Sequence, residues 1–411
     1  MGENGAHNVL TEKQMQYAVA RMAKPGSQII GYDVKPASDK LAGFLGDHLR
    51  MILCVTENNV VRKIYLFIKT VPTGNIPKAD FINQNQFFKK EAMVFQLLEQ
   101  IPDVDCLNPW CTRAVIHNEK IIVMPDLAIL GYRTHPTEMY FDRNHVFVVV
   151  SSLARFHAAF ANYFTKRNQT HPHFIEEHAF FNEEPFSDAP WLKGAAKVNY
   201  QVLKEFSSKS IHYPIDLEEK LSQLYIKAYQ SLRNNEDTLN VVIHKDLWAN
   251  NILFQYNDNV PINAVLVDFQ LARYAPPTFD LMSLLYMTTS RQFRDCYENE
   301  VFHHYYKVFS ESLDDCTKQR LQNLNYDFAE FLKWCERSRM FGLVQANTTI
   351  PCVCMEPDVA QKTFDDPDTY VEHVTGDRSK PVVAHSRENV QYRLRQLEVS
   401  EEFVEKYVCE M

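Results

Sequence analysis

The first 125 residues alternate apolar and polar positions in the manner of β-strands. The segments 48–56 (HLRMILCVT) and 60–69 (VVRKIYLFIK) are rich in the β-branched and aromatic residues that favour strands. A turn-prone Glu-Asn-Asn segment at 57–59 joins them, so we expect a hairpin. A second hairpin is expected around residues 118–119. Between the two hairpins, the spacing of the apolar residues predicts one helix over about 80–100.

From residue 126 onward the apolar residues recur at helical spacing instead. Helices are expected over 140–164, 191–233 and most of 279–350. Two short strands, VVIH (241–244) and AVLVDF (264–269), interrupt this part, and the polar stretch 355–385 predicts a long exposed loop. The fold class predicted is therefore α+β, with a small strand-rich N-terminal lobe at 1–125 and a larger helical C-terminal lobe at 126–411.

Composition narrows the class of protein. Apolar residues make up 45% of the 411 residues, which is enough for a large core, and the net charge of −9 gives no reason to expect nucleic acid as a partner. The nine cysteines are too irregularly spaced for a disulfide scaffold. The N-terminus lacks the apolar segment of a signal peptide, and apolar runs such as 146–150 are too short to span a membrane. We therefore expect a cytoplasmic protein with no membrane span; the sequence carries no signal for an oligomeric state.

The segment VVIHKDLWANNILF contains the strongest indication of chemistry. His244, Asp246 and Asn251 have the spacing of the kinase catalytic loop, in which a carboxylate accepts the proton of the substrate hydroxyl and an amide oxygen binds Mg²⁺. Such a spacing arises by chance in roughly one chain of this length in twenty, assuming equal residue frequencies. The motif is therefore only suggestive by itself.

The strands that follow strengthen this interpretation. Asn251 stands just before one predicted strand and Asp268 ends the next, so antiparallel pairing brings the two residues to one place. This is the arrangement of the metal-binding pair of kinases, with Asp268-Phe269-Gln270 in place of Asp-Phe-Gly. The alternative is structural, an Asx turn at Asn251 and a helix cap at Asp268. We favour the metal site, because spacing, order and strand context agree.

A third element lies upstream. Lys69 ends an apolar strand, where an unpaired ammonium is costly to bury, although a lysine at a strand end can also extend to solvent. Glu91 lies on the apolar face of the helix predicted over 80–100, together with Phe88 and Phe95. We expect an ion pair between Lys69 and Glu91, the pair that positions nucleotide phosphates in kinases. With it, the predicted fold becomes a protein-kinase-like fold of two lobes, the N-lobe binding ATP.

The position of the phosphate-binding loop is not evident. No Gly-x-Gly-x-x-Gly segment exists, and Ser38, Gly43 and Gly46, just before the strand at 48, are the candidates. A Walker A motif is absent as well, which excludes a P-loop kinase.

Several other residues have ordinary structural interpretations. His157 is expected to be a packed core histidine, because it has helical spacing from Leu153 and Phe160. Asp280 is expected to cap a helix, and the acids at 183–184 to lie on a solvated face.

The chain resembles a known family, the ecdysteroid kinase-like proteins, within the choline kinase and aminoglycoside phosphotransferase superfamily. The resemblance runs from about residue 30 to 346 and rests on the order of FIKTVP (67–72), FFKKEAMVF (87–95), MPDL (124–127) with Gly131, LARFHA (153–158), IHKDLWANN (243–251), VDFQ (267–270) and FDL (279–281).

The resemblance implies a role for each matched residue. Lys69 and Glu91 would serve ATP, Asp246 would act in catalysis, and Asn251 and Asp268 would bind Mg²⁺. The hinge at 124–127 would meet the adenine through backbone groups.

Two departures from the family pattern matter. Members usually carry Gly between the His and the Asp of the catalytic loop, where this chain has Lys245. The hinge usually reads Glu-Asp-Leu, and here Pro125 replaces the Glu. Because proline lacks an N–H, adenine must be met by Asp126, Leu127 or a carbonyl.

Together these features predict a kinase that transfers a phosphoryl group from ATP, with Mg²⁺, to a hydroxyl of a small-molecule acceptor. No Ala-Pro-Glu segment follows the metal motif, which argues against a protein kinase. We expect the acceptor to be a steroid (ecdysteroid-like) or other lipophilic alcohol, with Trp248 as a wall of its pocket. The alternatives are a choline- or ethanolamine-type kinase and a non-catalytic nucleotide- or lipophile-binding pseudokinase.

Overall fold

The N-terminal lobe is a curved antiparallel sheet with three helices. The computed structural model describes residues 9–38, 45–101, 108–177, 179–183 and 189–409. The strand order is β1-β2-β3-β5-β4, and the elements are α1 (Glu12–Met22), β1 (Gln28–Pro36), β2 (Asp47–Glu57), β3 (Val60–Thr70), α2 (Ile76–Gln84), α3 (Phe87–Leu98), β4 (Ile116–His117) and β5 (Ile121–Pro125).

The predicted hairpin between β2 and β3 is confirmed. Asn58 and Asn59 form its two-residue turn, and both have positive φ (50° and 63°), which asparagine tolerates better than most residues. The single helix predicted over 80–100 was wrong. It is broken between α2 and α3 at Gln86, whose φ of 54° cannot continue a right-handed helix. Glu91 stays on the buried face of the second piece.

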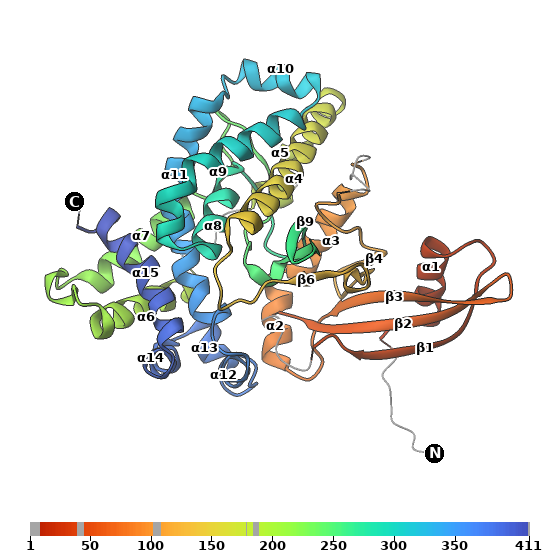
Figure 1. The fold of residues 1–411 in the computed structure, drawn as a ribbon, viewed down its shortest axis with the longest axis horizontal. Helices are drawn as coiled ribbons and strands as arrows, with labels where there is room; N and C mark the ends of the chain where they lie inside the picture. Colours follow the sequence, from red (N-terminus) through yellow and green to blue (C-terminus); the bar gives the residue numbers. More distant parts are fainter. Residues whose placement is uncertain (1–8, 39–44, 102–107, 178, 184–188, 410–411) are drawn as a thin grey trace.

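The C-terminal lobe is mostly helical, and its long helix α4 packs along α9 (Figure 1) and against β9. Its elements are η1 (Leu127–Leu130), β6 (Tyr132–Thr134), α4 (Arg143–Thr170), α5 (Phe174–Glu177), η2 (Ala179–Asn182), α6 (Pro190–Phe206), η3 (Ser210–His212), α7 (Leu217–Gln230), β7 (Val241–Ile243), η4 (Ala249–Asn251), β8 (Ile252–Asn257), β9 (Val260–Leu266), β10 (Arg273–Ala275), α8 (Thr278–Thr288), α9 (Arg291–Glu311), α10 (Asp315–Asn323), α11 (Phe328–Val353), α12 (Pro357–Phe364), α13 (Tyr370–Thr375), α14 (Ser379–Glu388) and α15 (Val390–Tyr407).

The whole is an α+β fold with a small sheet-containing lobe and a larger helical lobe, which confirms the predicted protein-kinase-like class. The division at residue 125 stays a prediction. In length and composition α4 is apolar enough to cross a membrane, but 61% of its apolar window is buried inside the protein, so core packing accounts for its composition.

The loop predicted over 355–385 was wrong, because this segment forms α12, α13 and the start of α14. It also joins the lobes: α13 lies beside α2 of the N-terminal lobe (Figure 1). Lys78 forms an ion pair of 2.8 Å with Asp365, and the ring of Phe81 meets that of Tyr370 edge-on at 6.2 Å. Charged residues are as numerous as apolar ones here, so the pattern indicates an exposed segment, yet Asp365 pairs across the lobe boundary.

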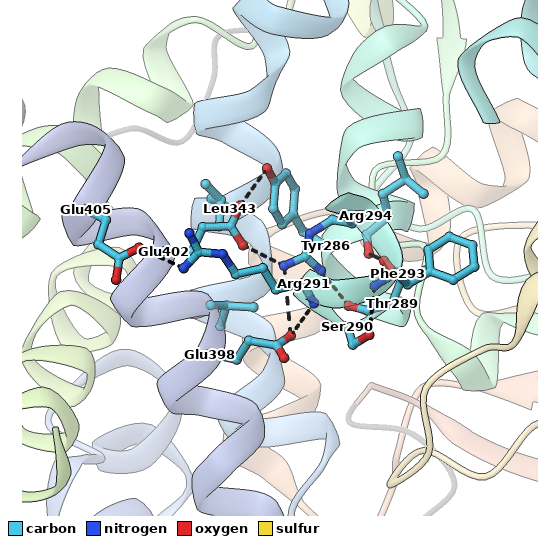
Figure 2. A network of polar contacts seen from close by, with 12 residues as sticks. Tyr286, Thr289, Ser290, Arg291, Phe293, Arg294, Leu343, Glu398, Glu402 and Glu405 are labelled. Atoms are coloured by element: carbon cyan, nitrogen blue, oxygen red, sulfur yellow. Dashed lines mark hydrogen bonds and ion pairs between the residues drawn. The ribbon is translucent and has the colours of Figure 1, made fainter. Parts of the chain in front are cut away.

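The C-terminal helix α15 is held by a cluster of arginines and glutamates (Figure 2). Arg294 is 3% exposed and donates to Glu402 at 2.6 Å, while Arg291 donates to Glu405 at 2.7 Å. The backbone N–H of Arg291 also donates to Glu398. These bonds fix α15 to the junction between α8 and α9. Since α15 packs against α11 and α6, they support the helices that line the cavity described below.

We expect Arg294→Ala to lower the free energy of unfolding by about 3–5 kcal/mol, because it leaves the carboxylate of Glu402 buried without its partner. The matched change Arg62→Ala removes an ion pair whose arginine is 53% exposed, and should cost about 1 kcal/mol or less. Urea unfolding of the two variants measures both. Equal losses would mean that the cluster does not anchor α15.

Candidate active site

The ammonium of Lys69 joins three segments of the chain. Lys69 lies near the end of β3 and is 2% exposed. Its Nζ donates to Glu91 Oε2 on α3 at 2.7 Å, to Asp268 Oδ1 at 2.8 Å and to Gln270 Oε1 at 2.9 Å. Burial alone would lower the pKa of Lys69, but the charges of Asp268 and Glu91 outweigh it and raise the pKa above its ordinary value. The predicted pair of Lys69 and Glu91 is present, and Gln270 is a further acceptor that the sequence did not suggest.

One buried carboxylate binds the backbone of the catalytic-loop segment. Asp280 accepts the backbone N–H of His244 at 2.6 Å and that of Lys245 at 2.7 Å. It also contacts Nε2 of His157 at 3.1 Å, and the other ring nitrogen of His157 meets the hydroxyl of Tyr305. The prediction of a helix cap at Asp280 was therefore wrong. His157 is the fully buried core histidine that was expected.

The side chain of Asp246 faces the cavity next to Asn251. Asn251 Nδ2 donates to the Asp246 carbonyl at 2.8 Å and to its Oδ2 at 2.9 Å. The Asp246 N–H donates to Nδ1 of His244, whose Nε2 donates to the carbonyl of Val267. Burial, followed by the charge of Asp268, raises the pKa of Asp246 to about 6. A carboxylate with such a pKa is ionised at pH 7 and is a stronger base than an ordinary aspartate.

The hairpin predicted after the catalytic loop is present and brings Asn251 and Asp268 together. β8 pairs with β9, and the N–H of Val267 donates to the carbonyl of Asn251 at 3.1 Å. Asp268 has a φ of 69°, a left-handed conformation that few aspartates adopt and that turns its carboxylate toward Lys69. The predicted metal pair therefore meets at one place.

The oxygen atoms at this place fit a magnesium ion. In the part of the chain that the structure describes, the bonds above use the amide nitrogen of Asn251 and Oδ1 of Asp268, which leaves one oxygen on each side chain. Mg²⁺ is commonly bound by one or two such oxygens, with phosphates and water supplying the rest. No group of three His, Cys, Asp or Glu side chains suited to a metal occurs among the described residues, so a site made by protein ligands alone is not present there.

The hinge residues 124–127 line the cavity, but one of their backbone N–H groups already has a hydrogen-bond partner. The Asp126 N–H donates to the carbonyl of Tyr65 at 3.0 Å. Its carboxylate caps η1 through Ala128 and forms an ion pair with Arg50 at 3.0 Å. The N–H of Asp126 is therefore already used in the sheet, and Leu127 is the hinge amide that we retain for adenine.

Two of the three candidates for a phosphate-binding loop fall on described residues. Gly43 lies outside them, whereas Ser38 lines the cavity. Gly46 has a φ of 89°, and a Cβ there would come within 3.3 Å of Lys69 Cγ and 3.2 Å of the Thr70 carbonyl. A side chain at Gly46 would therefore disturb Lys69.

One cavity of about 1040 Å³ is lined by Lys69, Glu91, Asp126, Asp246, Asn251 and Asp268. Its wall also includes Trp248, Trp191 and Tyr229, the end of α11, and residues of α12 and α13. Trp248 lies on the wall where the sequence placed it, and its role stays a prediction. The contribution of α11–α13 was missed, because nothing in their local pattern distinguishes a cavity wall from ordinary packing.

Glu183 was predicted to lie on a solvated face, and this too was wrong. It forms an ion pair of 2.6 Å with Lys90, the residue before Glu91 on α3, and lies 3.9 Å from Arg273. Lys90 therefore points toward the C-terminal lobe and lines the cavity. Only the fold brings these residues, separated by about 90 positions, into contact.

Comparison with known proteins gives one family and several distant structures. The profile of the ecdysteroid kinase-like family matches residues 40–318, whereas no curated protein matches the chain. Solved structures that match the chain include the GDP complex of a point mutant of aminoglycoside 2'-phosphotransferase-IIIa. The two sequences are 10% identical, the match covers 96% of this chain and 98% of that chain, and the TM-score is 0.38.

Another is the GDP and kanamycin complex of an aminoglycoside phosphotransferase, with 10% identity, coverage of 92% and 100%, and a TM-score of 0.36. A microcompartment-associated aminopropanol kinase has 11% identity, coverage of 82% and 94%, and a TM-score of 0.35. Similarities this distant carry no weight for function. The family profile covers more than half of the chain and spans Lys69, Glu91, Asp246, Asn251 and Asp268. The chain therefore belongs to the ecdysteroid kinase-like family and is a small-molecule phosphotransferase.

Proposed function

We propose that this protein is an ATP- and Mg²⁺-dependent kinase that phosphorylates a hydroxyl group of a steroid (ecdysteroid-like) or other lipophilic alcohol. The observation that carries the proposal is the meeting of Lys69, Asp268, Asn251 and Asp246 in one cavity, which continues past Asp246 into a region with aromatic walls. We also infer that it acts in the cytoplasm, which is consistent with the free thiols of the described cysteines.

Each residue has a separate task in this proposal. Bound in the cavity, MgATP would supply the transferable phosphoryl group and a cation that offsets its negative charge. Asn251 and Asp268 would hold the metal through their remaining oxygens. Asp246 would orient the acceptor hydroxyl and accept its proton. The complete set favours an enzyme over a pseudokinase.

Lys69 would hold the nucleotide phosphates by exchanging one of its present hydrogen-bond partners. An ammonium has three hydrogens to donate, and Lys69 already gives them to Glu91, Asp268 and Gln270. A phosphate must therefore displace one acceptor. We infer that this is Gln270, because a neutral amide competes less well than a carboxylate for the ammonium.

The size and lining of the cavity support a lipophilic acceptor. Pockets for small organic ligands are mostly apolar, with a few polar groups that fix orientation. Past Asp246 the wall carries the rings of Trp191, Tyr229, Trp248 and Tyr370. A choline-type acceptor would require carboxylates near such rings, and in the described part of the wall the acids are Glu91, Asp126, Asp246 and Asp268, all of which have the tasks above.

An acceptor panel with labelled ATP tests the proposal. We expect a polyhydroxylated steroid to be phosphorylated with a higher kcat/KM than choline or ethanolamine. Asp246→Asn should lower turnover by about 10²-fold or more, because the amide cannot accept the hydroxyl proton. Asp258→Asn, at the exposed tip of the β8–β9 hairpin, is the matched control and should turn over like the native protein. Preference for choline, or normal turnover in Asp246→Asn, would contradict the proposal.

A magnesium titration of nucleotide binding tests the metal ligands. We expect Asp268→Ala to weaken nucleotide binding about 10-fold or more at saturating Mg²⁺, and to change it little in chelator, because the carboxylate acts through the metal. Gln270→Ala also removes one acceptor of Lys69 but no metal ligand, so it should keep the native dependence on Mg²⁺. If both variants respond alike, Asp268 is not a ligand.

Steady-state kinetics test the pocket wall. We expect Trp248→Ala to raise the KM for the acceptor and to leave that for ATP nearly unchanged, because the ring lies on the acceptor side of Asp246. Trp248→Phe keeps an apolar ring and should raise the KM for the acceptor less than Trp248→Ala does. An acceptor KM that does not respond to the tryptophan would remove Trp248 from the pocket.

A further inference from the structure

Two buried cations that line the cavity have no carboxylate partner in the part of the chain that the structure describes. Lys245 is 6% exposed and Arg378 is 3% exposed, and both line the cavity. Among the described residues, neither forms an ion pair with an aspartate or a glutamate. A buried charge is normally paired or hydrogen-bonded because the loss of hydration is costly. These two residues therefore indicate a negative partner that is not part of the described chain.

Lys245 is held in an unfavourable backbone conformation next to the catalytic carboxylate. Its φ is 67°, a region in which glycine is at ease and lysine is strained. The bond from its N–H to Asp280 keeps it there. Its ammonium lies 5.3 Å from the centre of the Tyr229 ring. The chain therefore places a cation beside Asp246 at a position where a residue without a side chain would be less strained.

Arg378 lines the same cavity, and its charge lies close enough to the Tyr229 hydroxyl to act on its pKa. It directly precedes α14, and its guanidinium donates to the carbonyl of Trp191 at 3.3 Å and lies beside the thiol of Cys352. Its Nε has no hydrogen-bond partner in the described structure. Trp191 in turn meets Tyr229 edge-on at 5.3 Å. Lys245 therefore contacts Tyr229 and Arg378 contacts Trp191, the two rings of one aromatic pair.

The charges around these two residues do not neutralise them. Glu183 already forms an ion pair with Lys90 and lies near Arg273. Burial, with the charges of Arg273 and Lys90 added to it, lowers the pKa of Lys245 to about 7. Of the acids that act on the pKa of Lys245, Asp246 has the larger effect, and the proposed reaction needs it as a base. An anion bound here would restore the fully charged lysine.

We propose that the acceptor is an amphiphilic alcohol with an anionic group, a carboxylate or a sulfate, that Lys245 and Arg378 bind while Tyr229 and Trp191 contact its apolar body. This inference rests on the proposed function, because it assigns the charge of the alcohol that Asp246 activates. It excludes choline and ethanolamine as preferred acceptors, because both are cations. A neutral steroid would fill the aromatic part of the cavity and leave the two cations unpaired.

A pair of fluorescent probes tests the anion site without requiring turnover. 8-Anilinonaphthalene-1-sulfonate and N-phenyl-1-naphthylamine share an apolar ring system and differ in the sulfonate. We expect the sulfonate to bind the native protein at least 10-fold more tightly than the neutral amine. Lys245→Gly and Arg378→Gln should each reduce this ratio about 5-fold or more, and Lys245→Gly should fold well because it removes the strain at φ 67°.

Three further variants separate charge from structure. Lys245→Arg and Arg378→Lys keep the positive charge and should keep most of the preference for the sulfonate. Lys380→Gln, two residues after Arg378 but exposed on α14, should leave the ratio unchanged. The inference would be overturned if the native protein bound the sulfonate and the amine about equally, or if Lys245→Gly and Arg378→Gln left the ratio of the two affinities unchanged. It would also be overturned if only Lys245→Gly lowered the ratio and bound ATP abolished that effect, because Lys245 would then bind the nucleotide.

Turnover of a matched acceptor pair separates this inference from the proposed function. Cholic acid and its methyl ester carry the same hydroxyls on the same steroid and differ in charge. We expect the acid to have at least a 10-fold higher kcat/KM, and Arg378→Gln to remove most of the difference. Equal phosphorylation of the two would overturn the anionic acceptor while supporting the alcohol kinase. Selective binding of the sulfonate with no alcohol phosphorylated across the panel would overturn the kinase and support an anion-binding cavity.

Discussion

The buried ammonium of Lys69 is the interaction on which the arrangement of the site depends. It joins β3 and α3 of the N-terminal lobe to the segment after β9 in the other lobe, through acceptors at 2.7–2.9 Å. Removing any one acceptor would leave a cation in a nearly water-free place with less compensation. The three segments are therefore held together by one charge, and the cavity lies where they meet.

A second buried charge, Asp280, sets the path of the catalytic loop. It accepts consecutive backbone N–H groups, from His244 and Lys245, and contacts His157 on α4. Two consecutive donors pointing at one carboxylate require an unusual backbone, which is why Lys245 has a positive φ. The same geometry directs Asp246 into the cavity and Lys245 along its wall. A structural carboxylate in the core thus decides the orientation of residues that we assign to function.

The far wall of the cavity comes from the C-terminal segment, which is attached at two places. Arg294 and Glu402 bind α15 to the helical core, and Lys78 and Asp365 bind the segment before α13 to the N-terminal lobe. The walls that would contact an acceptor therefore depend on residues far from the catalytic loop. This division agrees with the family match, which covers residues 40–318 and ends before these helices begin. Lys69, Asp246 and Asp268 lie within the matched range, whereas the cavity-lining residues of α11, α12 and α13 lie beyond it.

The sequence by itself determined the features that depend on local pattern and order. The β2–β3 hairpin followed from alternation and a turn-forming Asn-Asn pair, and the positions of Asp246, Asn251 and Asp268 followed from spacing plus strand pairing. The pairing of Lys69 with Glu91 followed because a charge on an apolar surface needs a partner. Each of these inferences uses residues that are near in sequence, or a single strong energetic requirement.

Only the tertiary structure decided the rest, because the partners come from distant segments whose local patterns are ordinary. Gln270 as an acceptor of Lys69, Asp280 beneath the catalytic loop and Glu183 beside Lys90 all look like common polar residues in sequence. The segment 355–385 reads as an exposed loop, since Asp365 and Asp377 find their lysine partners only in distant segments of the fold. That Lys245 and Arg378 have no carboxylate partner among the described residues is likewise invisible in sequence, because the neighbours of a buried group are known only from the fold.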